Sequence, residues 1–285
     1  MKKIFSFFNA FSNNVKDGIK NLTGTQKTHI KYFVLLSFMC VALVGVTRPI
    51  IQNALNTQAV SSQAEKSSKN LPIYCVNTDE NKVGISFDAA WGADDTEELL
   101  TILANNDVKA TFFLCGYWVD DYPDEVKRIF EEGHEIGNHS DTHPHGSQIS
   151  LEQNKQEISA VHEKVKELLD YEMSLYRPPF GEYNDTVLQA ASELNYHTIQ
   201  WDIDSLDWKE YGVEHEVNQV LNHSHLGNGS IMLFHNDAEY TPDSLDTILK
   251  GLKEKGFEVV PIGELIHTEN YYMDHEGRQH KEQAN

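Results

Sequence analysis

From residue 73 onward, segments typical of buried strands alternate with segments typical of amphipathic helices, and this alternation strongly constrains the fold. Strands are predicted at 82–87, 109–116, 134–140, 174–177, 196–204, 229–235 and 257–262, with helices at 94–106, 122–133, 150–169, 184–194, 214–222 and 243–255 between them. Repeated strand–helix units place the strands parallel and the helices outside. About seven such units predict an α/β fold, a closed or nearly closed parallel barrel in a single domain at 73–269, followed by a polar tail at 270–285.

The chain before this domain divides into three parts by charge and hydropathy. Residues 1–31 hold six lysines against one aspartate, a balance of +5, whereas 32–51 is built on the uncharged apolar run 32–46, and 52–72 is a polar linker. A membrane-spanning helix needs roughly 20 residues, which the run reaches if Lys31 and Arg48 extend to the interfaces. A long basic segment and no small-residue cleavage site favour an uncleaved transmembrane helix over a signal peptide, with a buried core helix as the alternative.

The uneven distribution of charge predicts how the chain is oriented in the membrane, and it argues against one class of partner. The basic segment keeps the N-terminus in the cytoplasm and places the domain outside the cell membrane, as a single-pass protein. Because the whole chain carries −21 and residues 1–31 carry +5, the remainder carries −26. An acidic domain of this kind argues against nucleic acid as a partner. Cys75 and Cys115 lie outside the apolar run in no metal-type spacing, so a disulfide and two buried thiols both stay open.

Several chemically distinctive side chains lie at, or just beyond, the C-terminal ends of the predicted strands. They are Asp88, His139, His143, Arg177, Asp204, Asp207 and His235. The carboxyl ends of parallel strands share one face of an α/β barrel, and active sites are built there from residues far apart in sequence. The sequence therefore predicts that these side chains meet at one site.

The residue types at these positions suggest hydrolytic metal chemistry. His139 and His143 are four residues apart, so one turn can present two neutral imidazoles to a divalent cation and leave coordination positions open. Beside a metal-bound water Asp88 would be a general base, Arg177 would orient it and keep it ionised, and His235 would be a general acid. The alternatives are a solvated histidine loop, a carboxylate cap, a surface cation and a core histidine.

The motifs "SFDAAW", "HSDTH", "RPPFG", "DSLDW" and "LFH", in this order, resemble those of the NodB-homology polysaccharide deacetylases, carbohydrate esterase family 4. The resemblance covers about residues 73–265 and implies an irregular (β/α) barrel. It also implies that Asp88 is the catalytic base, that His139 and His143 bind the metal, and that Arg177 supports the base. The backbone N–H near Phe180 would help to hold the oxyanion.

The last two motifs imply further roles on the leaving-group side of the site. Asp204 would tune the acid histidine, His235, and Trp208 would wall the substrate pocket. Leu233 would line the pocket for the acetyl group.

The first motif departs from the family pattern at one position. A second aspartate usually follows the base and completes an Asp-His-His metal triad, but this chain has Ala89 there. The metal would then be held by two imidazoles with water or another group, for which Asp94 and Asp95 are candidates. Binding by two imidazoles should be weaker than binding by the full triad.

The resemblance implies removal of N-acetyl groups from cell-wall amino sugars, with peptidoglycan as the expected glycan substrate. The expected cofactor is a divalent cation, zinc in the first place and Co, Mn or Ni as alternatives. The stretch "FDAAWG" resembles the sporulation-associated branch of these deacetylases. Chitin-like oligomers, O-acetyl esters, a metal amidase acting on peptide stems and a non-catalytic glycan-binding homologue stay open, as does the oligomeric state.

Overall fold

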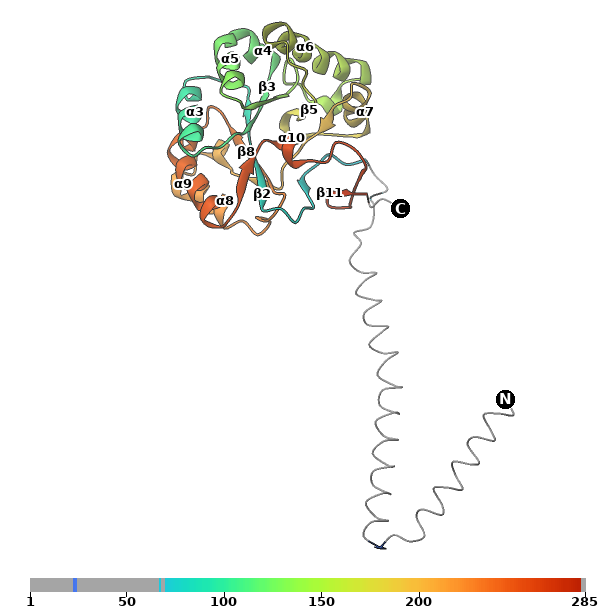
Figure 1. Cartoon of the computed structure of the whole chain (residues 1–285). Helices are drawn as coiled ribbons and strands as arrows, with labels where there is room; N and C mark the ends of the chain where they lie inside the picture. Colours follow the sequence, from blue (N-terminus) through green and yellow to red (C-terminus); the bar gives the residue numbers. More distant parts are fainter. Residues whose placement is uncertain (1–22, 25–66, 68–69, 283–285) are drawn as a thin grey trace, which may run out of the picture. The chain divides into compact units, whose positions relative to one another are not determined.

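The computed structural model describes residues 23–24, 67 and 70–282 (Figure 1). The chain divides into the units Met1–Ala64 and Glu65–Asn285, and the fold given below belongs to the second unit. The predicted transmembrane segment 32–51 and most of the linker lie outside the described residues. Within the described ranges, no helix is both long and apolar enough to cross a membrane.

The main sheet of the domain is parallel throughout, as the strand–helix alternation predicts. Its strands pair in the order β6-β5-β4-β3-β2-β8-β7, and β9 pairs with the first part of β2. The bounds are β2 Lys82–Ala89, β3 Thr111–Leu114, β4 Glu135–Asn138, β5 Leu175–Tyr176, β6 His197–Thr198, β7 Ile203–Asp204, β8 Ile231–His235 and β9 Glu258–Val260.

The sheet forms a half-barrel, and the expected single strand at 196–204 is wrong. Residues 197–198 and 203–204 form two short strands at opposite ends of the sheet order, β6 and β7. The chain crosses the open side between them, where Ile199 makes a single parallel bridge to Ile73. The Asp202 side chain then accepts hydrogen bonds from the Ile231 backbone N–H at 2.8 Å and the Ser230 hydroxyl at 3.1 Å, which ends the first strand and turns the chain toward β8.

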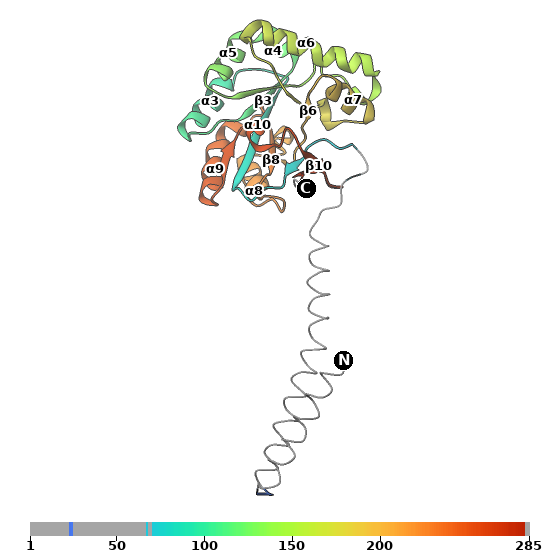
Figure 2. The same ribbon diagram turned by 45° about the vertical axis from the view of Figure 1, so that its right-hand side comes forward.

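Most of the helices lie around the outside of the sheet (Figures 1 and 2), whereas the last one, at 262–265, packs into the core inside the half-barrel through Ile262 and Leu265. Their bounds are α3 Thr96–Asn105, α4 Gly116–Asp121, α5 Pro123–Glu131, α6 Leu151–Leu169, α7 Asp185–Glu193, α8 Val213–Leu221, α9 Thr241–Glu254 and α10 Ile262–Leu265. The longest, α6, begins where Ser150 and Gln153 cap each other reciprocally. Such caps satisfy backbone N–H groups that have no partner inside the helix.

Side-chain alternation along the strands separates the core into two parts. Phe87 of β2 packs on Phe112 of β3 and Phe234 of β8, at ring centroid distances of 4.9 and 5.8 Å, in the cluster that contacts the helices. Phe113 belongs to the other cluster, inside the half-barrel. Because successive strand residues point to opposite faces, Asp88 points into the half-barrel at the end of β2.

The C-terminal stretch 270–285, expected as a polar tail, instead contains two strands. The strands β10 Tyr271–Met273 and β11 Arg278–Lys281 are antiparallel, and β11 pairs in parallel with β1 Cys75–Val76. Asp274 holds the turn, since its carboxylate accepts from the Arg278 backbone N–H at 3.0 Å and lies 2.9 Å from His280 Nε2. The turn depends on these polar hydrogen bonds, which hydropathy does not reveal.

Candidate active site

The residues predicted for the site converge on one cavity at the carboxyl ends of the strands. This cavity of about 370 Å³ is lined by Asp88, Ala90, Trp91, His139, His143, Phe180, Gly181, Trp201, Asp204, Trp208, Leu233 and His235. Arg177 and Asp207, also predicted for the site, are fully buried behind the cavity wall, Arg177 against Asp88 and Asp207 against His235. A larger cavity of about 640 Å³ lies between α7 and β10 and contains none of the predicted site residues.

Asp88 is buried but keeps its charge because of a buried arginine. Arg177 Nη1 donates to Asp88 Oδ1 at 2.8 Å, and Nη2 donates to the Gln200 carbonyl at 3.2 Å. The guanidinium also lies 4.1 Å above the centre of the Phe113 ring. Burial alone would raise the pKa of Asp88, yet the charge of Arg177, with smaller contributions from His139 and His235, holds that pKa below its usual range. Asp88 is therefore a carboxylate that can accept a proton.

Two histidines at the end of β4 present nitrogen lone pairs beside this carboxylate. His139 Nδ1 lies 2.8 Å from the Arg177 carbonyl oxygen, so Nδ1 carries the proton and Nε2 is free to bind a metal. His139 Nε2 is 3.5 Å from Asp88 Oδ2. The His143 ring centroid is 5.0 Å from that of His139, and burial lowers the pKa of His143 to about 4. Both imidazoles suit a metal because a ligating nitrogen must be unprotonated.

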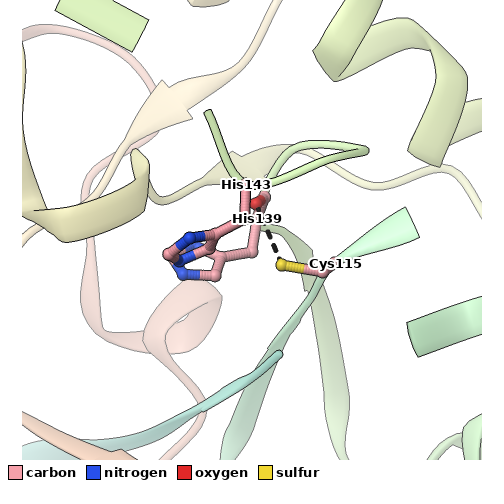
Figure 3. A group of neighbouring side chains, drawn as sticks. All are labelled: Cys115, His139 and His143. Atoms are coloured by element: carbon pink, nitrogen blue, oxygen red, sulfur yellow. Dashed lines mark hydrogen bonds between the residues drawn. The ribbon is translucent and has the colours of Figure 1, made fainter. Parts of the chain in front are cut away.

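Cys115 adds a third donor that sequence analysis did not assign to the site. Its thiol and one nitrogen of each of His139 and His143 all lie within 4.8 Å of one another, and Figure 3 shows the sulfur beside the two imidazoles. The thiol donates a hydrogen bond to the His139 carbonyl at 3.4 Å. Two imidazoles and a thiolate are donors that zinc prefers. Burial raises the pKa of the Cys115 thiol, so a cation would have to displace the thiol proton to gain this third donor. The two unprotonated imidazoles fit a divalent cation as they stand, and Cys115 completes the group when it loses its proton. Cys115 directly follows β3, the same strand-end position that singled out the other residues.

The sequence candidates for an additional ligand, Asp94 and Asp95, are not in this donor group. They lie in the segment leading into α3, where Asp95 is the residue before its first turn. Ala89 is fully buried, and its carbonyl accepts from the Cys115 backbone N–H at 3.0 Å. Cys115 is therefore hydrogen-bonded through its backbone to residue 89, the position at which a second aspartate was expected.

The hydrogen-bonded partner of His235 is Asp207, while Asp204, the residue expected to tune this histidine, acts on it through its charge. Asp207 is fully buried and accepts from the His235 backbone N–H at 2.7 Å, and its Oδ1 lies 2.8 Å from His235 Nδ1. Asp204 Oδ1 instead accepts from the Leu206 backbone N–H at 2.9 Å. The two aspartates are three positions apart in the sequence, and the short 3-10 turn at Asp207–Lys209 aims the second one at the histidine.

The surrounding carboxylates decide the protonation of His235. Burial alone would lower its pKa, but the hydrogen bond and charge of Asp207, together with the charges of Asp88 and Asp204, raise that pKa to about 9. His235 is then protonated at neutral pH, with Nδ1 held by Asp207 and Nε2 left to donate. The cavity thus combines a carboxylate base and an imidazolium acid, which is the requirement for general acid–base catalysis.

Exposed aromatic rings surround the mouth of the cavity. Trp91, Phe180 and Trp208 are 55%, 54% and 56% exposed although they line it. Phe180 has φ of 60°, a left-handed conformation that is uncommon for a bulky residue and typical of functional sites. Its ring stacks on His145 at a centroid distance of 4.3 Å, and His145 Nδ1 lies 3.1 Å from the Glu182 carboxylate. His145, which lies two residues after His143, is therefore outside the metal donor group.

Comparisons with known proteins agree with this geometry. The polysaccharide deacetylase family profile matches residues 76–199. A peptidoglycan-N-acetylmuramic acid deacetylase of Bacillus subtilis is 32% identical over 68% of this chain and 74% of its own length. A peptidoglycan-N-acetylglucosamine deacetylase of Bacillus cereus is 34% identical over 66% of this chain and 69% of its own length.

Solved structures that resemble this chain include a protein described as a pseudoenzyme. A CE4 family pseudoenzyme from Bacillus anthracis is 29% identical, with a TM-score of 0.66 over 76% of this chain and 74% of that one. A mutant of this pseudoenzyme with restored enzymatic activity is 32% identical, with a TM-score of 0.67 over 70% of this chain and 72% of that one. With the curated relatives and the shared motifs, these likenesses show that the chain belongs to the polysaccharide deacetylase family, the NodB-homology domain of carbohydrate esterase family 4.

Proposed function

We propose that this chain is a metal-dependent hydrolase that removes N-acetyl groups from the amino sugars of peptidoglycan. The observation that carries the proposal is that two ion pairs lie at one cavity, one between Asp88 and Arg177 and the other between His235 and Asp207. The first keeps a base deprotonated and the second keeps an acid protonated. The relatives named as peptidoglycan deacetylases support the substrate class.

The cation would be held by His139 and His143, with Cys115 as the third protein donor. When bound, a divalent cation such as zinc polarises the acetyl carbonyl and lowers the pKa of a coordinated water. The remaining chemistry belongs to side chains of the protein. Asp88 removes the proton from the attacking water, while Arg177 keeps the Asp88 carboxylate ionised and oriented.

The other residues of the cavity act on the substrate. The backbone N–H of Phe180 donates to the developing oxyanion, and the Leu233 side chain faces the acetyl methyl group. His235 Nε2–H donates its proton to the amine nitrogen as the C–N bond breaks, so acetate and a free amine leave. Trp208 forms a wall of the cavity against the sugar ring.

A second function, glycan binding without catalysis, is favoured by one observation, Ala89. The position expected for a metal-binding carboxylate holds a methyl group, and structural relatives include a pseudoenzyme. The deciding experiment incubates the full chain, purified in mild detergent, with peptidoglycan in the presence and absence of added zinc, and measures released acetate. Zinc-dependent acetate supports the hydrolase. Retention of the protein on peptidoglycan with no acetate at any zinc concentration would show a binding protein.

The partner of the acid histidine can be tested by the pH dependence of activity. His235 must be protonated to act, so kcat/KM should hold up to about pH 9 and fall above it. Asp207→Asn removes a negative charge and its hydrogen bond, so the pKa of His235 should fall toward its usual value, near 6.5, and the alkaline limit should drop by about one pH unit or more. Asp204→Asn is the matched control and should shift the limit less. Equal shifts in the two variants would contradict the assignment of Asp207.

Restoring the carboxylate at position 89 should strengthen metal binding. The Ala89 carbonyl accepts from the Cys115 backbone N–H at 3.0 Å, so Ala89→Asp places a carboxylate next to the residue that supplies the third donor, and a further charged oxygen ligand should tighten zinc binding by about tenfold, or about 1.4 kcal/mol. Isothermal titration of the metal-free protein with zinc measures the change. An unchanged affinity in a correctly folded variant would mean that residue 89 does not face the metal.

We also propose that segment 32–51 anchors the protein in the cell membrane, with the N-terminus in the cytoplasm and the domain outside. The basic segment 1–31 and the apolar run support this orientation. The full-length chain should sediment with membranes and be released by detergent rather than by salt, and protease added to intact cells should remove the domain. Full-length protein in the soluble fraction would overturn the proposal.

A further inference from the structure

The loop that carries the two metal-binding histidines, residues 139–143, has an unusual backbone conformation. Ser140 and His143 have φ of 67° and 55°, in the left-handed region that residues other than glycine adopt infrequently. Such a conformation is costly and persists only where surrounding contacts enforce it. The contacts of this loop therefore decide whether His143 stays beside His139, as Figure 3 shows it.

Two side chains within or next to the loop set its local shape. The Ser140 backbone N–H donates to Asn138 Oδ1 at 2.9 Å, and the His143 backbone N–H donates to Ser140 Oγ at 3.1 Å. Each of these bonds joins residues that are two or three positions apart in the sequence. Short-range bonds of this kind shape a turn without fixing where it lies against other elements.

Backbone bonds to the start of α4 fix the first part of the loop in place. The Gly116 N–H donates to the Ser140 carbonyl at 3.0 Å, and the Tyr117 N–H donates to the Asp141 carbonyl at 3.2 Å. These bonds reach the loop as far as Asp141. The part that contains the second imidazole, from Thr142 onward, needs a further contact to hold its position.

That contact comes from Glu157 of α6, fifteen positions after Thr142. Glu157 Oε2 accepts from the Thr142 backbone N–H at 2.7 Å, and Oε1 accepts from the Thr142 hydroxyl at 2.8 Å. Two short bonds between one carboxylate and one residue fix direction as well as distance. We propose that Glu157 is a positioning residue for the metal site: by holding Thr142 it keeps the adjacent His143 where both imidazoles can share one cation with Cys115.

The inference rests on the proposed metal-dependent function, and it gives Glu157 a role at a distance from the substrate. Glu157 is half-buried and is not among the residues that line the cavity. Its effect on the reaction would therefore pass through the metal ligand. Residues that hold a metal ligand in this way typically change metal affinity by about 10- to 100-fold when they are replaced.

The test compares Glu157→Gln with Glu157→Met by titrating the metal-free full chain, in mild detergent, with zinc. Glutamine can keep both bonds, because its oxygen accepts from the Thr142 N–H and its amide donates to the Thr142 hydroxyl, whereas methionine makes neither. We expect Glu157→Met to bind zinc about tenfold more weakly than the parent, and Glu157→Gln to stay within about threefold of it. Glu167→Met, at an exposed glutamate of the same helix, is the control and should bind zinc like the parent.

Cobalt provides a spectroscopic measurement that a general loss of stability would not change. At saturating cobalt the ligand-field bands report the geometry around the metal. They should match the parent in Glu157→Gln and differ in position or intensity in Glu157→Met. Thermal unfolding of the metal-free variants shows that each is folded before it is titrated.

The proposal is overturned if Glu157→Met binds zinc as tightly as the parent, or if Glu157→Gln loses as much affinity as Glu157→Met, which would show an effect of charge alone. If Glu157→Met does not fold, Thr142→Val decides. It removes one of the two bonds at an exposed position, so zinc binding should weaken by about two- to fivefold, and parental affinity would overturn the proposal. A parent that binds zinc but releases no acetate would refute the hydrolase and leave this comparison intact, whereas a parent that binds no zinc would overturn both.

Discussion

Replacing Asp88 by asparagine should lower acetate release from peptidoglycan by about 10²–10⁴-fold, the contribution typical of a general base. Asparagine has nearly the same size, and its side-chain oxygen can still accept from Arg177, but it cannot take up the proton of the attacking water. The loss should appear in kcat, since Asp88 acts on the reacting water rather than on the glycan. Zinc content and glycan affinity should stay at the parental level.

The control for this substitution is Asp94→Asn, the same change at an exposed carboxylate outside the metal donor group. It should leave both activity and zinc content unchanged. Thermal unfolding of each variant shows whether burial of an uncompensated Arg177 charge has destabilised the fold. Robust acetate release by Asp88→Asn would remove Asp88 from the role of base, even though the fold and the metal site would stand.

The double substitution His139→Ala with His143→Ala should abolish metal binding by the purified chain. It removes both imidazoles of the three-donor group and leaves one buried thiol, which cannot hold a divalent cation at micromolar concentrations alone. Zinc content measured after dialysis should fall from about one ion per chain to none. The control is His145→Ala, because His145 pairs with Glu182 and is not in the group.

Cobalt substitution tests the contribution of the thiol in the same preparation. If Cys115 is a ligand, cobalt-loaded parent protein should show a thiolate-to-metal charge-transfer band that is absent in Cys115→Ser. Cys115→Ser should bind zinc more weakly than the parent but more tightly than the double histidine variant. Unchanged zinc stoichiometry in the double variant would show that these histidines do not form the site.

The sequence alone determined the parallel architecture and the place of the site. Short strands that are buried along their length and longer amphipathic helices are local patterns, and their alternation leaves the parallel strand–helix arrangement as the stable solution. Asp88, His139, Arg177 and His235 follow strands that the pattern located. Because parallel strands end on one face, their convergence follows from the chain order without any knowledge of contacts.

Only the tertiary structure decided which of the site residues form hydrogen bonds with one another and which can share a metal. Asp204 and Asp207 are equally good partners for His235 in the sequence, and the short turn at Asp207–Lys209 selects the second. Cys115 becomes a third donor because β3 and β4 are adjacent in the sheet, with Leu114 opposite Asn138. The split of 196–204 into β6 and β7 and the hairpin at 271–281 depend on two aspartates, Asp202 and Asp274, whose hydrogen-bond partners are distant in the sequence or lie across a turn. Local periodicity records how each segment is buried, but hydrogen bonds between segments depend on packing that no single segment encodes.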